Sequence, residues 1–245
     1  MRLIRIYTEQ QLTPGQQICL EPTAARHVVQ VLRLRAGSNL VLFNGDGCNY
    51  TAQLEQASIN AAVAHILSAS EPEPQSILDI QLYISISKGE RMDFAIQKTV
   101  ELGVSGITPL FSQHGVVNLK GERLEKRQQH WHKVMVSACE QSGRCRLPVI
   151  HKAMDLDKLL EMPLHGLNLV LNHRADISLT EFDPPEKRIN LLVGPEGGLS
   201  DGEILAAQNC GFHGVRLGPR VLRTETAPLA AIAAIQTLWG DFRYS

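Results

Sequence analysis

Short apolar and polar runs alternate over about the first 68 residues, which is the pattern of short β-strands. Strands are predicted at Leu3–Tyr7, Gln17–Leu20, Leu40–Phe43, Tyr50–Leu54 and Ala62–Leu67. Asn44-Gly45-Asp46-Gly47 is a strong hairpin signal between two of them. One helix is predicted over Pro22–Leu32, with Val28, Val31 and Leu32 on its apolar face. Short strands with a single helix favour a small β-barrel.

A change of composition follows this segment. Ser68–Ser76 reads SASEPEPQS, in which prolines and charged or small polar residues replace the apolar pattern. Such a stretch is typical of a stiff linker. We therefore predict two domains, residues 1–72 and residues 73–245.

Strands alternate with helices in the second domain. Strands are predicted at Ile80–Ile86, Gly106–Leu110 and Leu167–Leu171, and helices at Met92–Leu102 and Lys120–Ser142. The apolar residues of the first helix are Phe94, Ile96, Val100 and Leu102. This alternation predicts an α/β domain with a parallel sheet.

Two glycine-containing turns near the end of the chain each follow an apolar run. Ile189–Val193 is typical of a buried strand, and Gly194-Pro195-Glu196-Gly197-Gly198 cannot continue it. Ser200 and Glu203 then form a capping-box pattern, which predicts the start of a helix. A strand, a glycine loop and a helix start in this order present free backbone N–H groups to a ligand.

The second turn likewise follows an apolar run and precedes a helix. Val215–Leu217 is a strand candidate, Gly218-Pro219 ends it, and a small apolar helix is predicted over Ala227–Leu238. Ligands of parallel sheets bind at the carboxyl ends of the strands, where both turns fall. Neither turn has the phosphate-loop pattern GxxxxGK[ST] or the dinucleotide pattern GxGxxG. Each turn alone is also compatible with a plain tight turn, so these residues leave the ligand open.

Composition narrows the function classes. No apolar run reaches the length of a membrane span, and the charged N-terminus indicates a strand and no signal peptide, so a cytoplasmic location is expected. Five scattered cysteines argue against a disulfide framework or a zinc site, and we expect no metal. The net charge of −1 does not indicate nucleic-acid binding, but residues 120–152 carry eight Lys/Arg against three acids. That segment favours either phosphate contacts or a solvated helix face.

Four motifs in one order carry a family resemblance. GPEGGLS, LGPRVLRTETA, KGERMDFAIQKTVELGV (Lys88–Val104) and ACEQSGR (Ala138–Arg144) resemble the SPOUT methyltransferases. The closest likeness is to the bacterial 16S ribosomal RNA uracil-N3 methyltransferase family, and it covers nearly the whole chain. The resemblance implies a trefoil-knotted α/β domain, an N-terminal PUA-like RNA-binding β-barrel, S-adenosyl-L-methionine as methyl donor and a homodimer. The implied substrate is 16S rRNA of the small ribosomal subunit.

With this family in view, we expect the two glycine loops to hold the cofactor mainly through backbone groups. The residues expected to do so are Leu171, Asn172, Gly194, Pro195, Glu196, Gly197, Leu217, Gly218, Leu222 and Thr224. A carboxylate near the sulfonium cation is electrostatically plausible, and Glu196 and Glu225 are the candidates. Their alternatives are a surface carboxylate for Glu196 and a helix N-terminal acid for Glu225.

Arg223 and Glu225 are the predicted catalytic residues. Neutral uracil N3 is a poor nucleophile, so its proton must leave and the resulting anion must be stabilised. Our hypothesis is that Arg223 donates to a uracil carbonyl oxygen as an electrostatic clamp. Glu225 is expected to hold Arg223 or to accept the proton.

The predicted RNA-binding residues are mostly arginines, which suit phosphate contacts and stacking on bases. They are Arg2, Arg5, Arg26, His27, Arg33 and Arg144. The stretch Arg26–Arg33 resembles a family element, and its alternative is the decoration of a surface helix. Two other functions stay open: methylation of another RNA position or a ribose hydroxyl, and a non-catalytic RNA-binding assembly factor.

Overall fold

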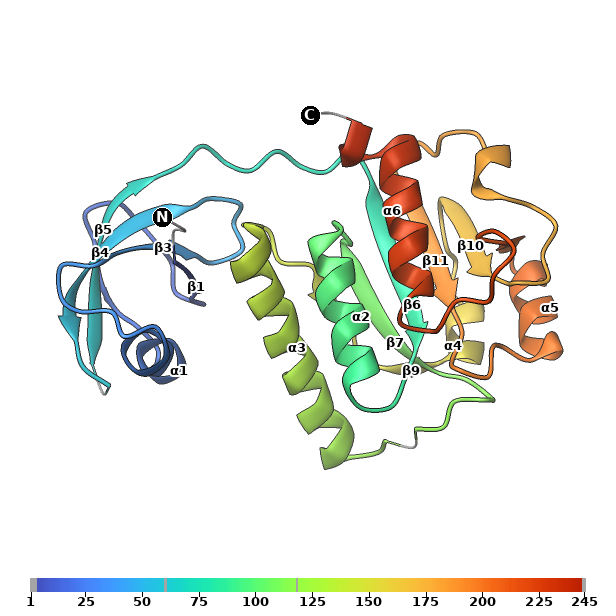
Figure 1. Ribbon diagram of the computed structural model, residues 1–245, viewed down its shortest axis with the longest axis horizontal. Helices are drawn as coiled ribbons and strands as arrows, with labels where there is room; N and C mark the ends of the chain where they lie inside the picture. The colour runs from blue at the N-terminus through green and yellow to red at the C-terminus, as the bar shows by residue number, and fades with distance from the viewer. Residues whose placement is uncertain (1–3, 60, 118, 244–245) are drawn as a thin grey trace. The chain divides into compact units, whose positions relative to one another are not determined.

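The computed structural model describes residues 4–59, 61–117 and 119–243, and the chain folds as two compact units (Figure 1). Unit 1 combines residues 1–75 with residues 136–147, and unit 2 combines residues 76–135 with residues 148–245. The predicted domain boundary at residue 73 stays a prediction. Nothing in the sequence indicates that residues 136–147, which are distant along the chain, also belong to unit 1.

Unit 1 contains a five-stranded sheet in the order β1-β3-β4-β5-β2. Its strands are β1 (Arg5–Tyr7), β2 (Gln17–Cys19), β3 (Asn39–Phe43), β4 (Tyr50–Ala57) and β5 (Ala62–Ala69). Strands β3 and β4 form the antiparallel hairpin predicted around Asn44–Gly47, and Leu42 lies opposite Tyr50. All five predicted strands are present among the described residues, and Leu3, the predicted start of the first strand, lies outside them. The predicted linker begins too early, because Ser68 still pairs with Thr51 in the sheet.

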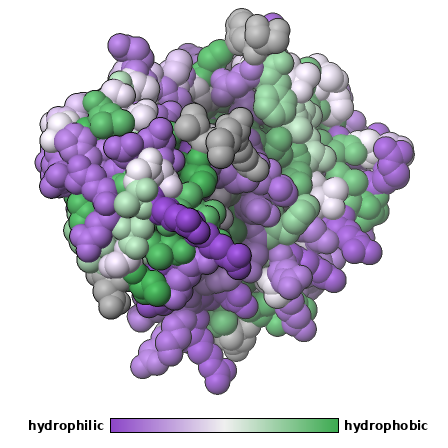
Figure 2. All heavy atoms as spheres, turned by 60° about the vertical axis from the view of Figure 1, so that its left-hand side comes forward, coloured by the Kyte–Doolittle hydropathy of each residue, from purple (hydrophilic) through white to green (hydrophobic). Residues whose placement is uncertain are grey.

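Alternate residues of these strands build the core of unit 1. Leu54 on β4 and Ile66 on β5 are fully buried, whereas their neighbours along each strand face outward. On the face of the molecule drawn in Figure 2, hydrophilic residues are interspersed with areas of hydrophobic ones. Strands β4 and β5 therefore bury the apolar half of an alternating pattern, whereas all four residues of Leu40–Phe43 on β3 are buried.

The helix of unit 1 departs from its predicted register. Helix α1 (Pro22–Arg26) continues into a π-helical turn, η1 (His27–Val31), in which Leu32 N donates to His27 O at 2.9 Å. A wider turn rotates the residues that follow it. Val28 is buried as predicted, but Val31 is 65% exposed, so its assignment to the apolar face is wrong.

The distant segment joins unit 1 through polar contacts. The Glu73 carboxylate accepts hydrogen bonds from Cys145 N at 2.7 Å and Arg146 N at 3.1 Å. The Glu140 side chain accepts one from Tyr7 N at 3.1 Å, and burial raises the pKa of the Glu140 carboxyl group. These bonds fix the end of α3 (Glu122–Ser142) and the turn after it to the sheet of unit 1.

Unit 2 contains a sheet in the order β12-β10-β11-β6-β7-β8, with β9 also paired to β7. The strands are β6 (Asp79–Ser85), β7 (Gly106–Phe111), β8 (Val149–Ile150), β9 (Met154–Asp155), β10 (Leu167–Leu171), β11 (Arg188–Val193) and β12 (His213–Val215). Every pair in this sheet is parallel, which confirms the predicted α/β arrangement. The short strands β8 and β9 are not predicted from the sequence, because two residues carry no periodic signal.

Helices cover both faces of this sheet. They are α2 (Glu90–Glu101), α4 (Leu156–Leu160), α5 (Asp201–Asn209) and α6 (Ala227–Trp239), with short 3-10 turns η2 (Leu179–Glu181) and η3 (Asp241–Arg243). Helices α2 and α6 lie side by side over β6 and β11 (Figure 1). Leu192 of β11 packs with residues of α4 and α5, and its neighbours in the strand point to the opposite face. Burial on both faces explains why β11 is a continuous apolar run.

One predicted detail of unit 2 is wrong, the end of β12, and one apolar residue of the predicted helix Met92–Leu102 is exposed. Phe94 is 44% exposed, because the buried side of α2 is formed by Met92, Ile96 and Val100 together with small residues. Strand β12 ends at Val215, so Leu217 lies in the loop that follows it.

Gln236 is a buried polar residue that ties the end of α6 to the end of α2. Its Nε2 atom donates to Leu102 O at 3.0 Å, and its Oε1 atom accepts from Asp241 N at 2.9 Å. Gly103 gives it room, because a Cβ atom there would lie 2.6 Å from Nε2, and the φ of +91° at this position also favours glycine.

We predict that Gln236→Leu lowers the free energy of unfolding by about 1–3 kcal/mol, because it leaves these backbone groups without their partner. Urea denaturation of the full chain measures the change. Thr237→Ala is the control, since Thr237 is exposed and bonds only its own helix, and we expect less than about 0.5 kcal/mol. Equal losses of unfolding free energy in the two variants would contradict the role given to the Gln236 side chain.

Candidate functional site

A cavity of about 410 Å³ lies in unit 2 where β10, β11 and β12 end. These three strands are adjacent and parallel, so the loops after them meet at one edge of the sheet. All residues predicted from the two glycine loops line it: Leu171, Asn172, Gly194, Pro195, Glu196, Gly197, Leu217, Gly218, Leu222, Arg223, Thr224 and Glu225. The structure thus brings both loops to one site, whereas the role of each residue stays a prediction.

The first loop, Gly194–Leu199, doubles back sharply after β11. Gly198 N donates to Pro195 O at 2.8 Å, and Gly198 has a φ of +73°. A Cβ atom on Gly194 would lie 2.9 Å from Leu199 N, so only glycine fits this close approach. The predicted capping box follows: Ser200 Oγ accepts from Glu203 N, and Ser200 N donates to the Glu203 carboxylate.

Thr224 joins the second loop to the first. Its side chain is buried, and its hydroxyl donates to Gly194 O at 2.9 Å. Arg223 O accepts from Ala227 N at 2.9 Å, which fixes the loop to the start of α6. The hydroxyl bond therefore closes the cavity between two segments that lie far apart in the sequence.

Glu196 and Glu225 lie in different environments. Arg91 of α2 forms an ion pair with Glu196 at 3.0 Å, so the Glu196 carboxylate already has a protein cation as partner. Glu225 has a buried Oε2 atom without a hydrogen-bond partner. A buried carboxylate oxygen without a partner is costly, so it marks a place where a ligand donor is expected.

The expected pairing of Glu225 with Arg223 is not present. Among residues 4–59, 61–117 and 119–243, no ion pair or hydrogen bond joins these two side chains, and Arg223 is exposed at the cavity. Side chains two positions apart in a loop need not face each other. Of the two roles proposed for Glu225, holding Arg223 is therefore not observed here, and proton acceptance remains a hypothesis.

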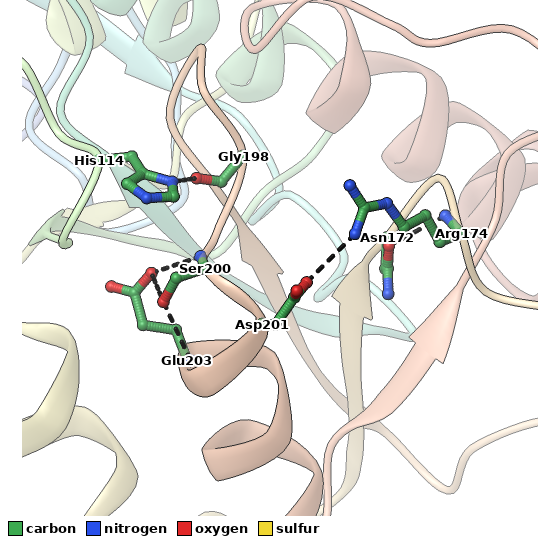
Figure 3. Close-up of polar contacts among 7 residues, drawn as sticks. All are labelled: His114, Asn172, Arg174, Gly198, Ser200, Asp201 and Glu203. Carbon is green, nitrogen blue, oxygen red and sulfur yellow. Dashed lines mark hydrogen bonds and ion pairs between the residues drawn. The ribbon is translucent and has the colours of Figure 1, made fainter.

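Residues from other loops hold the first glycine loop from outside (Figure 3). The His114 ring points toward Gly198 O, with Nδ1 at 3.2 Å, and Gln113 N donates to the Glu203 carboxylate at 2.7 Å. Arg174 forms an ion pair with Asp201 at 3.2 Å. Sequence reasoning missed His114 and Arg174, because neither belongs to a local motif and only the sheet order brings their loops here.

The predicted RNA-binding residues lie in unit 1, except Arg2, which falls outside the described residues. Arg26 and Arg33 are exposed, and Arg33 has a φ of +54° after the π-helical turn. His27 and Arg144 are partly buried.

Arg5 is engaged inside unit 1. Its guanidinium group donates to the Asn49 side chain and, at 2.9 Å, to Arg144 O, and it stacks 4.6 Å from the centre of the Phe43 ring. These contacts compete with RNA binding by Arg5 and give the residue a structural role that the sequence did not indicate.

The described residues also bear on metal binding, on the state of the cysteines and on membrane insertion. In the described part of the chain, no three His, Cys, Asp or Glu side chains gather in a group that could hold a metal ion. All five cysteines are free thiols, and burial raises the pKa of Cys139 to about 11. None of the helices within the described residues has the length and hydropathy needed to cross a membrane.

Comparison with known proteins decides the family. Residues 73–236 match a family model described as an RNA methyltransferase domain, and residues 20–67 match an RNA methyltransferase PUA domain. A ribosomal RNA small subunit methyltransferase E from Buchnera aphidicola subsp. Schizaphis graminum is 34% identical over 241 residues, 98% of each chain. The chain belongs to this methyltransferase E family. The Bacillus subtilis member is 26% identical over 93% of each chain.

Solved structures agree with this family assignment. The methyltransferase E from Neisseria gonorrhoeae bound to S-adenosyl methionine matches with a TM-score of 0.92 and 42% identity, over 98% of this chain and all of the other. A methyltransferase from Legionella pneumophila in complex with the same cofactor matches with a TM-score of 0.95 and 39% identity over the same shares. The mixed α/β fold with a PUA-like domain and a methyltransferase domain is therefore that of the family.

We predict that Thr224→Val loosens the first glycine loop. The change keeps the shape of the side chain but removes the bond to Gly194 O. Loss of one such bond should speed amide hydrogen exchange in residues 194–200 by roughly three- to tenfold.

Thr224→Ser retains the hydroxyl group and is the matched control, so its exchange should stay within about twofold of the native chain. The tie between the loops would be unimportant if the two variants exchanged at the same rate.

Proposed function

We propose that this protein transfers the methyl group of S-adenosyl-L-methionine to N3 of a uridine in 16S rRNA of the small ribosomal subunit. Membership of the methyltransferase E family and the cofactor in two related structures support the reaction class. The observation that carries the proposal is the cavity between the two glycine loops, which is lined by Glu225, a residue whose buried Oε2 atom has no hydrogen-bond partner.

Methylation at N3 makes three demands on the site. The imide proton must leave the base, the methyl carbon must be aligned with the nitrogen, and the Watson–Crick edge of the base must be exposed. Alignment supplies much of the rate, because it replaces an encounter between separate molecules with a fixed geometry. The bound cofactor supplies an electrophilic methyl group on a positively charged sulfur.

The cofactor fits the backbone-rich part of the cavity. Gly218 has open space where a side chain would lie, so a ligand can approach the main chain there, and Leu171, Leu217 and Leu222 supply apolar surface. Glu225 also lines the cavity and has a buried carboxylate oxygen without a partner, whereas Glu196 is already paired with Arg91. We therefore assign Glu196 to loop stability and Glu225 to the ligand.

Glu225 and Arg223 have complementary roles in this proposal. The Glu225 carboxylate accepts the N3 proton, and the N3 electron pair forms the new bond to the methyl carbon as the carbon–sulfur bond breaks. Arg223 donates to a carbonyl oxygen of the base and stabilises the negative charge that develops there. Its exposure at the cavity leaves its guanidinium group available for the substrate.

The rest of the expected arrangement belongs to the same proposal. Residues 1–72 form a PUA-like barrel that binds RNA through Arg26, His27 and Arg33, together with Arg144 from the distant segment of unit 1. Residues 73–245 form the methyltransferase domain. The passage of residues 216–226 from the sheet edge at β12 back to α6, past Gly194, supports a trefoil knot. A cytoplasmic homodimer is the form that we propose for the enzyme.

The test is methyl transfer from labelled S-adenosyl-L-methionine to small ribosomal subunits that lack the modification, followed by nucleoside mass analysis. Label in 3-methyluridine is the expected result. Label in another nucleoside would move the chain to a different target, and cofactor binding without any transfer to RNA would refute the proposal.

We predict that Arg223→Ala lowers kcat by roughly 10²–10³ and that Glu225→Gln lowers it by roughly 10²–10⁴. Arg223→Lys keeps the charge but not the planar fork of donors, so it should fall between Arg223→Ala and the native enzyme. Single-turnover methylation of subunits measures the rates, and circular dichroism confirms folding. Full turnover by folded Arg223→Ala would exclude the clamp.

A further inference from the structure

A second cavity, of about 360 Å³, lies beside the cofactor cavity and shares part of its wall. We call it the flanking cavity; it is lined by His114, Leu171–Arg174, Gly197–Asp201 and Ile204. Leu171–His173 and Gly197–Leu199 line both cavities. A ligand group in the flanking cavity is therefore separated from the cofactor only by the first glycine loop and the turn after β10.

Two side chains with N–H donors, His173 and Arg174, line the flanking cavity from the turn after β10, and Figure 3 shows Arg174 directed at Asp201. His114 donates its Nδ1–H to Gly198 O, so this ring holds the glycine loop and is not counted as a ligand donor. His173 and Arg174 lie in a turn that Asn172 fixes, because its Oδ1 atom accepts from Arg174 N at 2.9 Å. Imidazole and guanidinium groups in such a cluster suit an anion.

The present partner of Arg174 is weakly held. The ion pair with Asp201 is formed by side chains that are 69% and 89% exposed. Ion pairs with this exposure contribute little to stability, because water screens both charges. A phosphate group offers the same guanidinium a doubly charge-assisted contact, so it can displace the carboxylate.

We propose that the flanking cavity binds a backbone phosphate of the RNA next to the target uridine, with Arg174 and His173 as its donors. This inference rests on the proposed function and adds a substrate subsite to it. The target base must enter the cofactor cavity, so a phosphate of the same or the neighbouring nucleotide must lie just outside it. The described RNA-binding residues expected from sequence belong to unit 1, and this cluster gives unit 2 an RNA contact of its own.

Two variants of the ion pair separate this role from a structural one. Arg174→Ala removes the phosphate donor, whereas Asp201→Asn removes the competing carboxylate. If the pair only held the two loops together, both changes would break it and would act in the same direction. If Arg174 serves the phosphate, the two changes act in opposite directions on RNA binding.

The experiment measures binding of the full-length protein to small ribosomal subunits that lack the modification, at several salt concentrations. We expect Arg174→Ala to weaken binding about tenfold and to reduce the slope of log affinity against log salt by about 0.7–0.9. Asp201→Asn should strengthen binding about two- to threefold. Calorimetry should show S-adenosyl-L-methionine affinity within about twofold of native in both variants, since neither side chain lines the cofactor cavity.

Arg188→Ala is the matched control. Arg188 is also ion-paired, with Asp79 at 2.8 Å, but it starts β11 and so lies at the opposite end of the sheet. Its loss should leave the salt slope unchanged.

Any of three results would overturn the proposed phosphate site. Arg174→Ala and Asp201→Asn could change the affinity for subunits in the same direction, Arg174→Ala could leave the slope of log affinity against log salt unchanged, or the native protein could fail to bind subunits. Native protein that binds subunits but forms no 3-methyluridine would refute the proposed function alone, because the salt slopes still decide the role of the flanking cavity.

Discussion

The hydrogen bond from the Thr224 hydroxyl group to Gly194 O is the interaction on which the site depends. Three adjacent parallel strands bring their loops to one edge of the sheet, but this order alone leaves the loops free to diverge. The bond holds the segment after β12 against the end of β11, and the cavity exists because both segments stay there. Backbone groups that strands would otherwise pair are thereby presented to a ligand.

Other elements hold the first glycine loop from outside, so that its own residues remain available. Arg91 forms an ion pair with Glu196, and His114 forms a hydrogen bond with Gly198 O. The Glu203 carboxylate accepts hydrogen bonds from Ser200 N, in the capping box, and from Gln113 N. Rigid loops bind a cofactor at a lower entropic cost than mobile ones. Within this satisfied frame, the unpartnered oxygen of Glu225 stands out as the group left for chemistry.

Local patterns in the sequence predict the local parts of this structure. Five strands of unit 1, the four longer strands of unit 2 (β6, β7, β10 and β11), the capping box at Ser200 and the meeting of two glycine loops all follow from periodicity and turn chemistry. Contacts between distant residues do not. No local signal indicates that Glu73 binds the turn after α3, that Arg91 neutralises Glu196, or that a π-helical turn exposes Val31. Such features depend on tertiary packing between distant residues, and the hydrophobic periodicity of one sequence indicates only local secondary structure.

A crystal structure of the protein with S-adenosyl-L-methionine tests the central claim most directly. The account predicts the cofactor between the two glycine loops, with the Thr224 bond intact and the Glu225 carboxylate facing the methyl group or the space beside it. A cofactor bound outside this cavity, or a Glu225 side chain turned away from it, would contradict the account.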